Sequence, residues 1–170
     1  MCKEHIVMRA LLRKEPQYIR ELAKHTQLHP NTVLSVVDSL QQKSLVALQK
    51  EDKTFVRFTT TPFTKQYKAF LLIQELYTSG FMEYVEQHYE YPTVILFGSA
   101  ARGELSAHSD IDMCIISSKQ EDMDCSVFNA CLPRDLHLFI VTKQEFKAYP
   151  KELLQNMLNG VVLMGYMEVL

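Results

Sequence analysis

TVILFGSAARGELSAHSDIDM, residues 93–113, is the stretch that decides the fold of this chain. In it an apolar run ends at Gly98 and Ser99, and a second apolar run contains the aspartates Asp110 and Asp112. Side chains alternate between the two faces of a strand, so both aspartates are predicted to point to one face. Two carboxylates on one face favour a site for a hard divalent cation such as Mg2+, which takes oxygen ligands.

The segment between the two apolar runs has the features of a phosphate-binding turn. Glycine at position 98 allows the backbone to turn sharply and to approach a ligand closely. Ser99 is predicted to begin a short helix that extends to about residue 105, and helix N-termini attract phosphate groups. Arg102, in the same segment, is either a further phosphate contact or a solvent-facing surface residue.

The spacing of these motifs resembles a known superfamily. Phe97-Gly98-Ser99, followed after ten residues by Asp110-Ile111-Asp112-Met113, is similar to the signature of the DNA polymerase beta-like nucleotidyltransferases. The longer string GSAARGELSAHSDID resembles the minimal nucleotidyltransferases of prokaryotes. The resemblance implies a small nucleotidyltransferase fold with a mixed sheet and flanking helices.

This resemblance also implies a third carboxylate on a neighbouring strand. The best candidate is Asp135, at the start of the predicted strand around residues 136–142. Asp122 and Asp124 are alternatives, although they lie in a polar segment that is typical of a solvated loop. His137 follows Asp135 by two residues and could face the same site.

The implied reaction is nucleotidyl transfer. ATP or another nucleoside triphosphate would be held by Gly98, Ser99 and Arg102, and Mg2+, as two ions, by Asp110, Asp112 and Asp135. An acceptor hydroxyl, deprotonated with help from Asp135, would attack the alpha-phosphate and expel pyrophosphate, with positioning and charge neutralisation supplying most of the catalysis. The enzymes that the chain resembles often act as antitoxins that adenylylate a HEPN-domain toxin, which makes such a protein a candidate acceptor.

The first third of the chain has a different pattern. Helical periodicity predicts helices at about 6–14, 18–24 and 30–43, and β-branched and aromatic residues predict a hairpin with strands 45–49 and 54–60. This order, carried by YIRELAKHTQLHPNTVLSVVDSLQQKSLVAL, resembles a winged helix-turn-helix. The family places its third helix in the DNA major groove and its hairpin on the backbone. The resemblance therefore implies that the DNA contacts are Asn31, Thr32, Ser35 and Ser39 on the helix, and Lys50, Lys53 and Arg57 on the hairpin.

Two other roles for the N-terminal module stay open at the level of sequence. The recognition face lacks arginine, the residue that makes the commonest specific contact with guanine. Such modules also bind partner proteins or form homodimers. The chain is accordingly predicted to be either an enzyme with a DNA-binding or partner-binding module, or a DNA-binding regulator whose nucleotidyltransferase domain only senses nucleotide.

Charge supports a division of the chain into functional parts. Ten Lys/Arg and six Asp/Glu fall in residues 1–61, against eight and fourteen in residues 62–170. A basic segment favours phosphate backbones, and clustered acid suits cation binding. We predict an α+β protein with a winged helix-turn-helix domain at 1–61, connecting helices at 62–90 and a nucleotidyltransferase domain at 91–170, with Gly160 capping a helix at 150–159.

Composition and cysteine usage indicate the setting. No apolar run reaches the length of about 20 residues that a membrane helix needs. The first residues carry charges throughout, so no secretory signal is expected. The four cysteines contain no CxxC pair, which favours reduced thiols and a cytoplasmic location.

Overall fold

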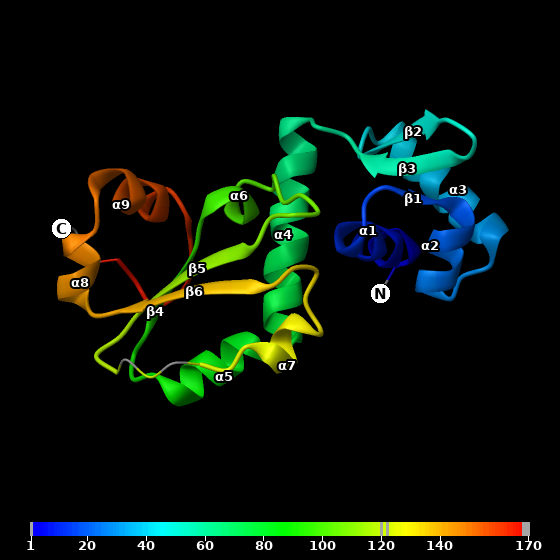
Figure 1. Cartoon of the computed structure of the whole chain (residues 1–170). Helices are drawn as coiled ribbons and strands as arrows, with labels where there is room; N and C mark the ends of the chain where they lie inside the picture. Colours follow the sequence, from blue (N-terminus) through cyan, green and yellow to red (C-terminus); the bar gives the residue numbers. More distant parts are fainter. Residues whose placement is uncertain (1, 120, 122, 168–170) are drawn as a thin grey trace. The chain divides into compact units, whose positions relative to one another are not determined.

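The computed structural model describes residues 2–119, 121 and 123–167. The chain divides into two compact units, residues 1–71 and 72–170 (Figure 1). This boundary lies inside helix α4 (Pro62–Thr78), whereas the sequence suggested a connecting segment at 62–90. The expected connecting helices are therefore shared between the two units instead of forming a separate piece.

The first unit contains three helices and a small sheet. Its elements in chain order are α1 (Lys3–Arg13), β1 (Gln17–Tyr18), α2 (Ile19–Thr26), α3 (Pro30–Gln42), β2 (Val46–Lys50) and β3 (Thr54–Phe58). The sheet is antiparallel, with the strand order β1-β3-β2. The helices and hairpin lie where the hydrophobic pattern places them, but β1 was not predicted, because two residues are too few to show alternation.

Helix α3 begins where local chemistry favours a helix start. Pro30 occupies the first turn, where its missing N–H costs nothing, and the His29 side chain accepts a hydrogen bond from the Asn31 N–H at 3.3 Å. Its apolar face, including Val33, Val37 and Leu40, is buried in the core of this unit. Its opposite face is left for solvent or for a ligand.

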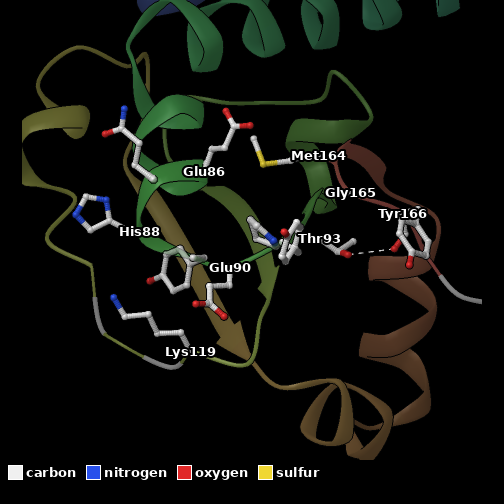
Figure 2. Close-up of a pocket in the computed structure, with 12 residues that line it drawn as sticks. Glu86, His88, Glu90, Thr93, Lys119, Met164, Gly165 and Tyr166 are labelled. Atoms are coloured by element: carbon white, nitrogen blue, oxygen red, sulfur yellow. Dashed lines mark hydrogen bonds between the residues drawn. The ribbon is translucent and has the colours of Figure 1, made fainter.

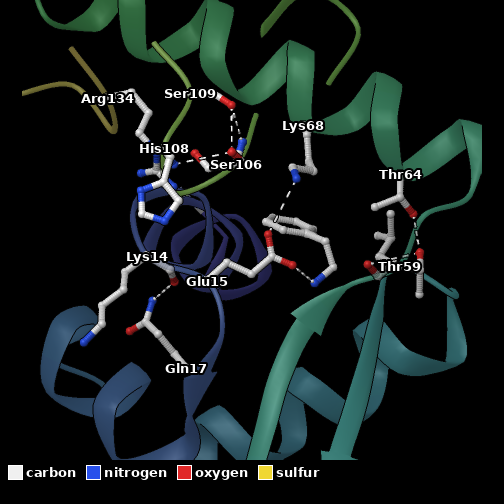
Figure 3. A network of polar contacts seen from close by, with 12 residues as sticks. Lys14, Glu15, Gln17, Thr59, Thr64, Lys68, Ser106, His108, Ser109 and Arg134 are labelled. Carbon is white, nitrogen blue, oxygen red and sulfur yellow. Dashed lines mark hydrogen bonds and ion pairs between the residues drawn. The ribbon is translucent and has the colours of Figure 1, made fainter. Parts of the chain in front are cut away.

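Polar contacts explain why the first half of α4 belongs to the first unit. Glu15 accepts a hydrogen bond from the Phe58 N–H at 2.7 Å and pairs with Lys68 of α4 at 3.5 Å (Figure 3). The fully buried Thr64 of α4 shares a hydrogen bond of 2.6 Å with Thr59, just after β3. The helix thus starts as a continuation of the first unit's packing.

The second unit is built on a four-stranded mixed sheet. After α4 its elements are α5 (Phe81–His88), β4 (Thr93–Leu96), α6 (Gly98–Ala101), β5 (Ile111–Ile116), α7 (Ser126–Asn129), β6 (Leu136–Val141), α8 (Lys143–Ala148), α9 (Lys151–Leu158) and β7 (Val161–Met164). The strand order is β6-β5-β4-β7, with β5 and β6 parallel and the other pairs antiparallel. The predicted α+β class, with a mixed sheet and flanking helices, is confirmed for this part of the chain.

Both faces of the central strands are buried. On one face, Cys114 and Ile116 of β5 join Ile95, Val141, Phe146 and Met157 in a core cluster beside α8 and α9. On the other face Ile111, Met113 and Ile115 are completely buried. A central strand buried on both sides reads as a continuous apolar run, so an aspartate within it needs a specific reason.

Two elements differ from the prediction. The helix expected from Ser99 to about 105 is a single turn, because Gly103 takes a positive φ of 66° and its N–H bonds back to Ala100 at 3.1 Å. The short helix α7 (Ser126–Asn129), which follows the predicted polar loop, was not expected; just before it, Asp124 accepts a hydrogen bond from the Ser126 N–H at 2.9 Å.

In the described part of the chain, none of the helices is both long and apolar enough to cross a lipid bilayer.

Alkylation should distinguish the four cysteines. Burial raises the pKa of Cys114 to about 12 and also raises that of Cys125, whose thiol is further disfavoured as an anion by Asp124. A raised pKa lowers the thiolate fraction, and the thiolate is the reactive form. We expect iodoacetamide at pH 8 to modify the exposed Cys2 and Cys131 first and Cys114 only after unfolding, as followed by peptide mass spectrometry.

Candidate active site

Backbone pairing between strands β5 and β4 fixes the position of Asp112 in the predicted site. This residue lies in β5, whose antiparallel register with β4 pairs Met113 with Leu96, so that Phe97 comes opposite Asp112. The Phe97 N–H donates to the Asp112 carbonyl oxygen at 3.0 Å. The Gly-Ser turn that ends β4 is therefore fixed next to this aspartate by one backbone hydrogen bond.

Gly98 makes the closest approach to the Asp112 side chain. Its φ is 69°, a left-handed conformation that favours glycine. A Cβ atom at this position would lie 2.7 Å from Oδ2 of Asp112, closer than a carbon atom can approach without displacing the oxygen. The predicted turn and one predicted metal ligand thus form a single packed unit, in which a side chain at position 98 would have to displace the Asp112 carboxylate.

Asp110 and Asp135 lie at the same edge of the sheet. Each immediately precedes a strand, β5 and β6 respectively, and these two strands are parallel neighbours. The Ile111 N–H donates to the Asp135 carbonyl oxygen at 2.8 Å, which aligns the two strand starts. Both aspartates are exposed. The fold therefore brings all three predicted carboxylate residues to one edge.

The side chains of Asp110, Asp112 and Asp135 do not come together in one cluster, although their backbones lie at the same edge of the sheet. Among residues 2–119, 121 and 123–167, the structure contains no group of three His, Cys, Asp or Glu side chains close enough to hold a metal ion. The donors available at the edge are carboxylate oxygens, the class that Mg2+ prefers, and Oδ2 of Asp112 faces a turn without a side chain. The residues present thus fit a hard cation by the chemistry of their donor atoms.

His137 is the residue whose contact the sequence could not establish. In the parallel register of β5 and β6 it lies directly across from Asp112, and its Nδ1 is 3.0 Å from Oδ1 of that residue. The sequence did place it two residues after Asp135, on the same face of a strand. The register between the strands, which determines its partner, is a tertiary feature.

The other predicted nucleotide-binding residues, Ser99 and Arg102, are less tightly packed than Gly98. Ser99 is half-buried, and its carbonyl accepts from the Glu104 N–H at 2.8 Å. Arg102 is exposed and pairs through Nε with Glu104 at 2.9 Å. Of the alternative acids, Asp124 accepts a hydrogen bond from the Ser126 N–H at the start of α7, and Asp122 lies outside the described residues.

One residue of the predicted DNA-binding face is engaged elsewhere. Ser39 donates to Glu4 of α1 at 2.7 Å, and Lys43 binds the same carboxylate at 2.7 Å. These hydrogen bonds, with the one from Lys43 contributing most, lower the pKa of Glu4. Ser39 therefore contacts α1: it is half-buried at the border of the buried stripe of α3, beside the buried Leu40.

The other predicted DNA-binding residues remain at the surface. Asn31 and Ser35 are exposed and Thr32 is half-buried, but the same face of α3 also carries the exposed Leu34 and Asp38. On the hairpin, Lys50 is exposed, Lys53 lies 4.7 Å from the centre of the Tyr18 ring, and Arg57 donates to Gln49 at 3.0 Å. The hairpin thus carries three of the ten Lys and Arg residues of positions 1–61, together with the acidic Glu51 and Asp52 in its turn.

A large hollow of the second unit lies away from the aspartates. It has a volume of about 890 Å³ and is lined by residues of α5, the segment before β4, and the end of β7 (Figure 2). Thr93, which begins β4, lies in it and donates to the Tyr166 carbonyl at 3.1 Å. Gly98 follows the opposite end of the same strand, so the hollow and the candidate site are at opposite ends of β4.

Comparison with known proteins supports the nucleotidyltransferase prediction for the second unit. The family model described as "Polymerase beta, Nucleotidyltransferase" matches residues 81–167, slightly more than half of the chain. No curated protein matches the chain. A solved structure of BpsR from Bordetella bronchiseptica, described as concerning regulation of its DNA binding by 6-hydroxynicotinic acid, matches with 22% identity over 51% of this chain and 58% of that chain. Its TM-score of 0.35 does not establish a common fold.

Proposed function

The chain belongs to the polymerase beta nucleotidyltransferase family, and from this membership we propose that it transfers a nucleoside monophosphate, AMP from ATP, to an acceptor hydroxyl. The observation that carries the proposal is the contact between the Gly98 turn and Oδ2 of Asp112. It places a turn without a side chain directly against a carboxylate. That arrangement suits a triphosphate bridged to protein through a divalent cation.

Each residue of the edge has a role in this proposal. Asp110, Asp112 and Asp135 would hold Mg2+, which supplies charge neutralisation at the triphosphate when bound. The Gly98-Ser99 backbone and the Ser99 hydroxyl orient the phosphates, with Arg102 as an outer contact. Asp135 accepts the proton of the acceptor hydroxyl, whose oxygen bonds to the alpha-phosphorus as the bond to pyrophosphate breaks.

Label transfer from ATP tests the proposal. The full chain, incubated with alpha-labelled ATP, Mg2+ and a candidate acceptor, should release pyrophosphate in proportion to acceptor labelling. EDTA in excess should abolish both signals, because carboxylates alone do not neutralise a triphosphate. Labelling that persists unchanged in EDTA would contradict a metal-dependent transfer.

The acceptor remains the open part of the proposal. A hydroxyl of a partner protein is our first choice, and a HEPN-type toxin is the partner class to try first. Incubation of the chain with such a protein should add the mass of one AMP to it, as read by intact-protein mass spectrometry. A small-molecule hydroxyl would instead leave the partner's mass unchanged while pyrophosphate is released.

For the first unit we propose a winged helix-turn-helix that binds DNA. Support comes from its element order, from the antiparallel hairpin after α3, and from the exposed cationic side chains on that hairpin. Helix α3 would enter the major groove through Asn31, Thr32 and Ser35. Protein binding or dimerisation remains the competing role, and the exposed Leu34 on the same face favours it.

Salt dependence separates DNA binding from protein binding. In a gel shift with upstream DNA, Lys53→Ala and Arg57→Ala should each weaken binding and reduce the slope of log K against log salt by about 1. Lys151→Ala in α9 is the matched control, since this exposed lysine belongs to the second unit. If ATP changes DNA affinity but no acceptor is ever labelled, the nucleotide-sensing regulator is the better description.

A further inference from the structure

We propose that His137 is a positioning residue that orients the Asp112 carboxylate for cation binding. The proposal rests on the proposed function, because it assigns Asp112 to the cation. It adds a histidine to a site otherwise composed of carboxylates. The argument uses three features of the second unit: the strand register, the direction of one hydrogen bond, and the packing beneath the imidazole ring.

The strand register places the two residues directly across from each other. Residues 111–116 of β5 pair with residues 136–141 of β6 in parallel, and Asp112 is matched with His137. Nδ1 of His137 and Oδ1 of Asp112 are 3.0 Å apart. An ionised carboxylate only accepts hydrogen bonds, so the imidazole nitrogen must donate. The contact therefore fixes one carboxylate oxygen through an Nδ1–H group.

The imidazole ring contacts a cluster of aromatic rings in tilted and edge-on arrangements. Its centre is 4.6 Å from that of Phe139, the next residue on the same face of β6. Phe139 in turn contacts Phe97 at 5.5 Å and Tyr149 at 6.3 Å between ring centres. Phe97 immediately precedes the Gly98 turn. The same apolar cluster thus supports both the turn and the histidine that binds Asp112.

The two oxygens of Asp112 consequently have different surroundings. Oδ1 accepts from His137, while Oδ2 faces Gly98, where a side chain would collide with it. The Asp112 side chain keeps 30% of its exposure, so solvent or a cation can reach it. Hydrogen bonds to ligating groups orient them, and loss of such partners typically costs 10–100-fold in metal affinity. His137 leaves Oδ2 directed toward the phosphate turn.

Replacing His137 with asparagine or with glutamine distinguishes positioning through Nδ1 from other roles of the imidazole ring. The Asn amide nitrogen lies close to the position of Nδ1, whereas the Gln amide nitrogen lies closer to that of Nε2. We expect His137→Asn to bind Mn2+ within about threefold of wild type, and His137→Gln and His137→Leu to lose about 10–100-fold. Binding is measured on the full chain without nucleotide, by electron paramagnetic resonance of free Mn2+, with Asp112→Asn as the reference.

The outcomes distinguish the two levels of the proposal. If all three His137 variants bind Mn2+ like wild type while Asp112→Asn does not, His137 does not position Asp112, and the proposed function stands. If His137→Asn loses as much affinity as His137→Leu, positioning through Nδ1 is wrong. If Asp112→Asn itself binds like wild type, the proposed function fails as well. Urea midpoints close to wild type identify the variants that remain folded, and the Gln variant replaces Leu if Leu unfolds.

Discussion

Replacing Asp112 with asparagine should lower nucleotidyl transfer at least about 100-fold, because it removes a negative charge at the position where a divalent cation would meet the triphosphate. Asparagine has nearly the same volume, and its amide oxygen can still accept the hydrogen bond from His137. The backbone contact between Phe97 N–H and the Asp112 carbonyl does not depend on the side chain. The loss is therefore expected in kcat rather than in folding.

The measurement is pyrophosphate release by the full chain at saturating ATP and Mg2+. Asp124→Asn is the matched control: it makes the same chemical change on an exposed aspartate of the same unit, and the asparagine amide oxygen can still accept the hydrogen bond from the Ser126 N–H. Its rate should equal that of wild type. Equal rates in wild type and Asp112→Asn would contradict the assignment of this residue.

Replacing Gly160 with alanine should destabilise the second unit by about 3 kcal/mol, at the upper end of the usual range for overpacking. The added Cβ would lie 2.4 Å from the Leu96 carbonyl oxygen and 2.9 Å from the Met157 carbonyl oxygen. These are backbone atoms, so no side chain can turn away to make room. Because Leu96 ends β4, the damage would extend to the Phe97-Gly98 turn.

Gly80→Ala is the control for this effect. Gly80 has a φ of 81°, but a Cβ there would meet no atom within 4 Å, so its cost is backbone strain alone, about 1 kcal/mol. Urea unfolding followed by circular dichroism should show a clearly larger loss for Gly160→Ala. A smaller loss than for Gly80→Ala would mean that β4 and α9 separate easily.

The glycines illustrate how far local reasoning extends. Gly98 was predicted as a turn residue from its place after an apolar run, and its positive φ confirms that local reading. Gly160 was predicted to cap α9, but the cap is Asn159, and Gly160 is not in the left-handed region. A side chain at position 160 would instead collide with the carbonyl oxygen of Leu96, a residue 64 positions earlier. A contact with so distant a residue leaves no pattern in the sequence around Gly160.

Helical faces show a similar limit. The periodicity of α3 correctly selected Val33, Val37 and Leu40 as core residues. It did not show that Ser39 would face Glu4 of α1, because the width of the buried stripe depends on where neighbouring helices lie. Likewise, the length of α6 was overestimated, since Gly103 ends the turn by conformation and not by polarity.

The sequence by itself determined the strand-turn-strand pattern and the family of the second unit, and it predicted the carboxylates of the site, because apolar period and motif spacing are local properties of the chain. Only the tertiary structure decided that Asp135 meets the start of β5, that His137 pairs with Asp112, and that α4 is divided between two units. The physical reason is register: the sequence predicts strands, but which residues face each other across two strands is selected by packing of the whole sheet.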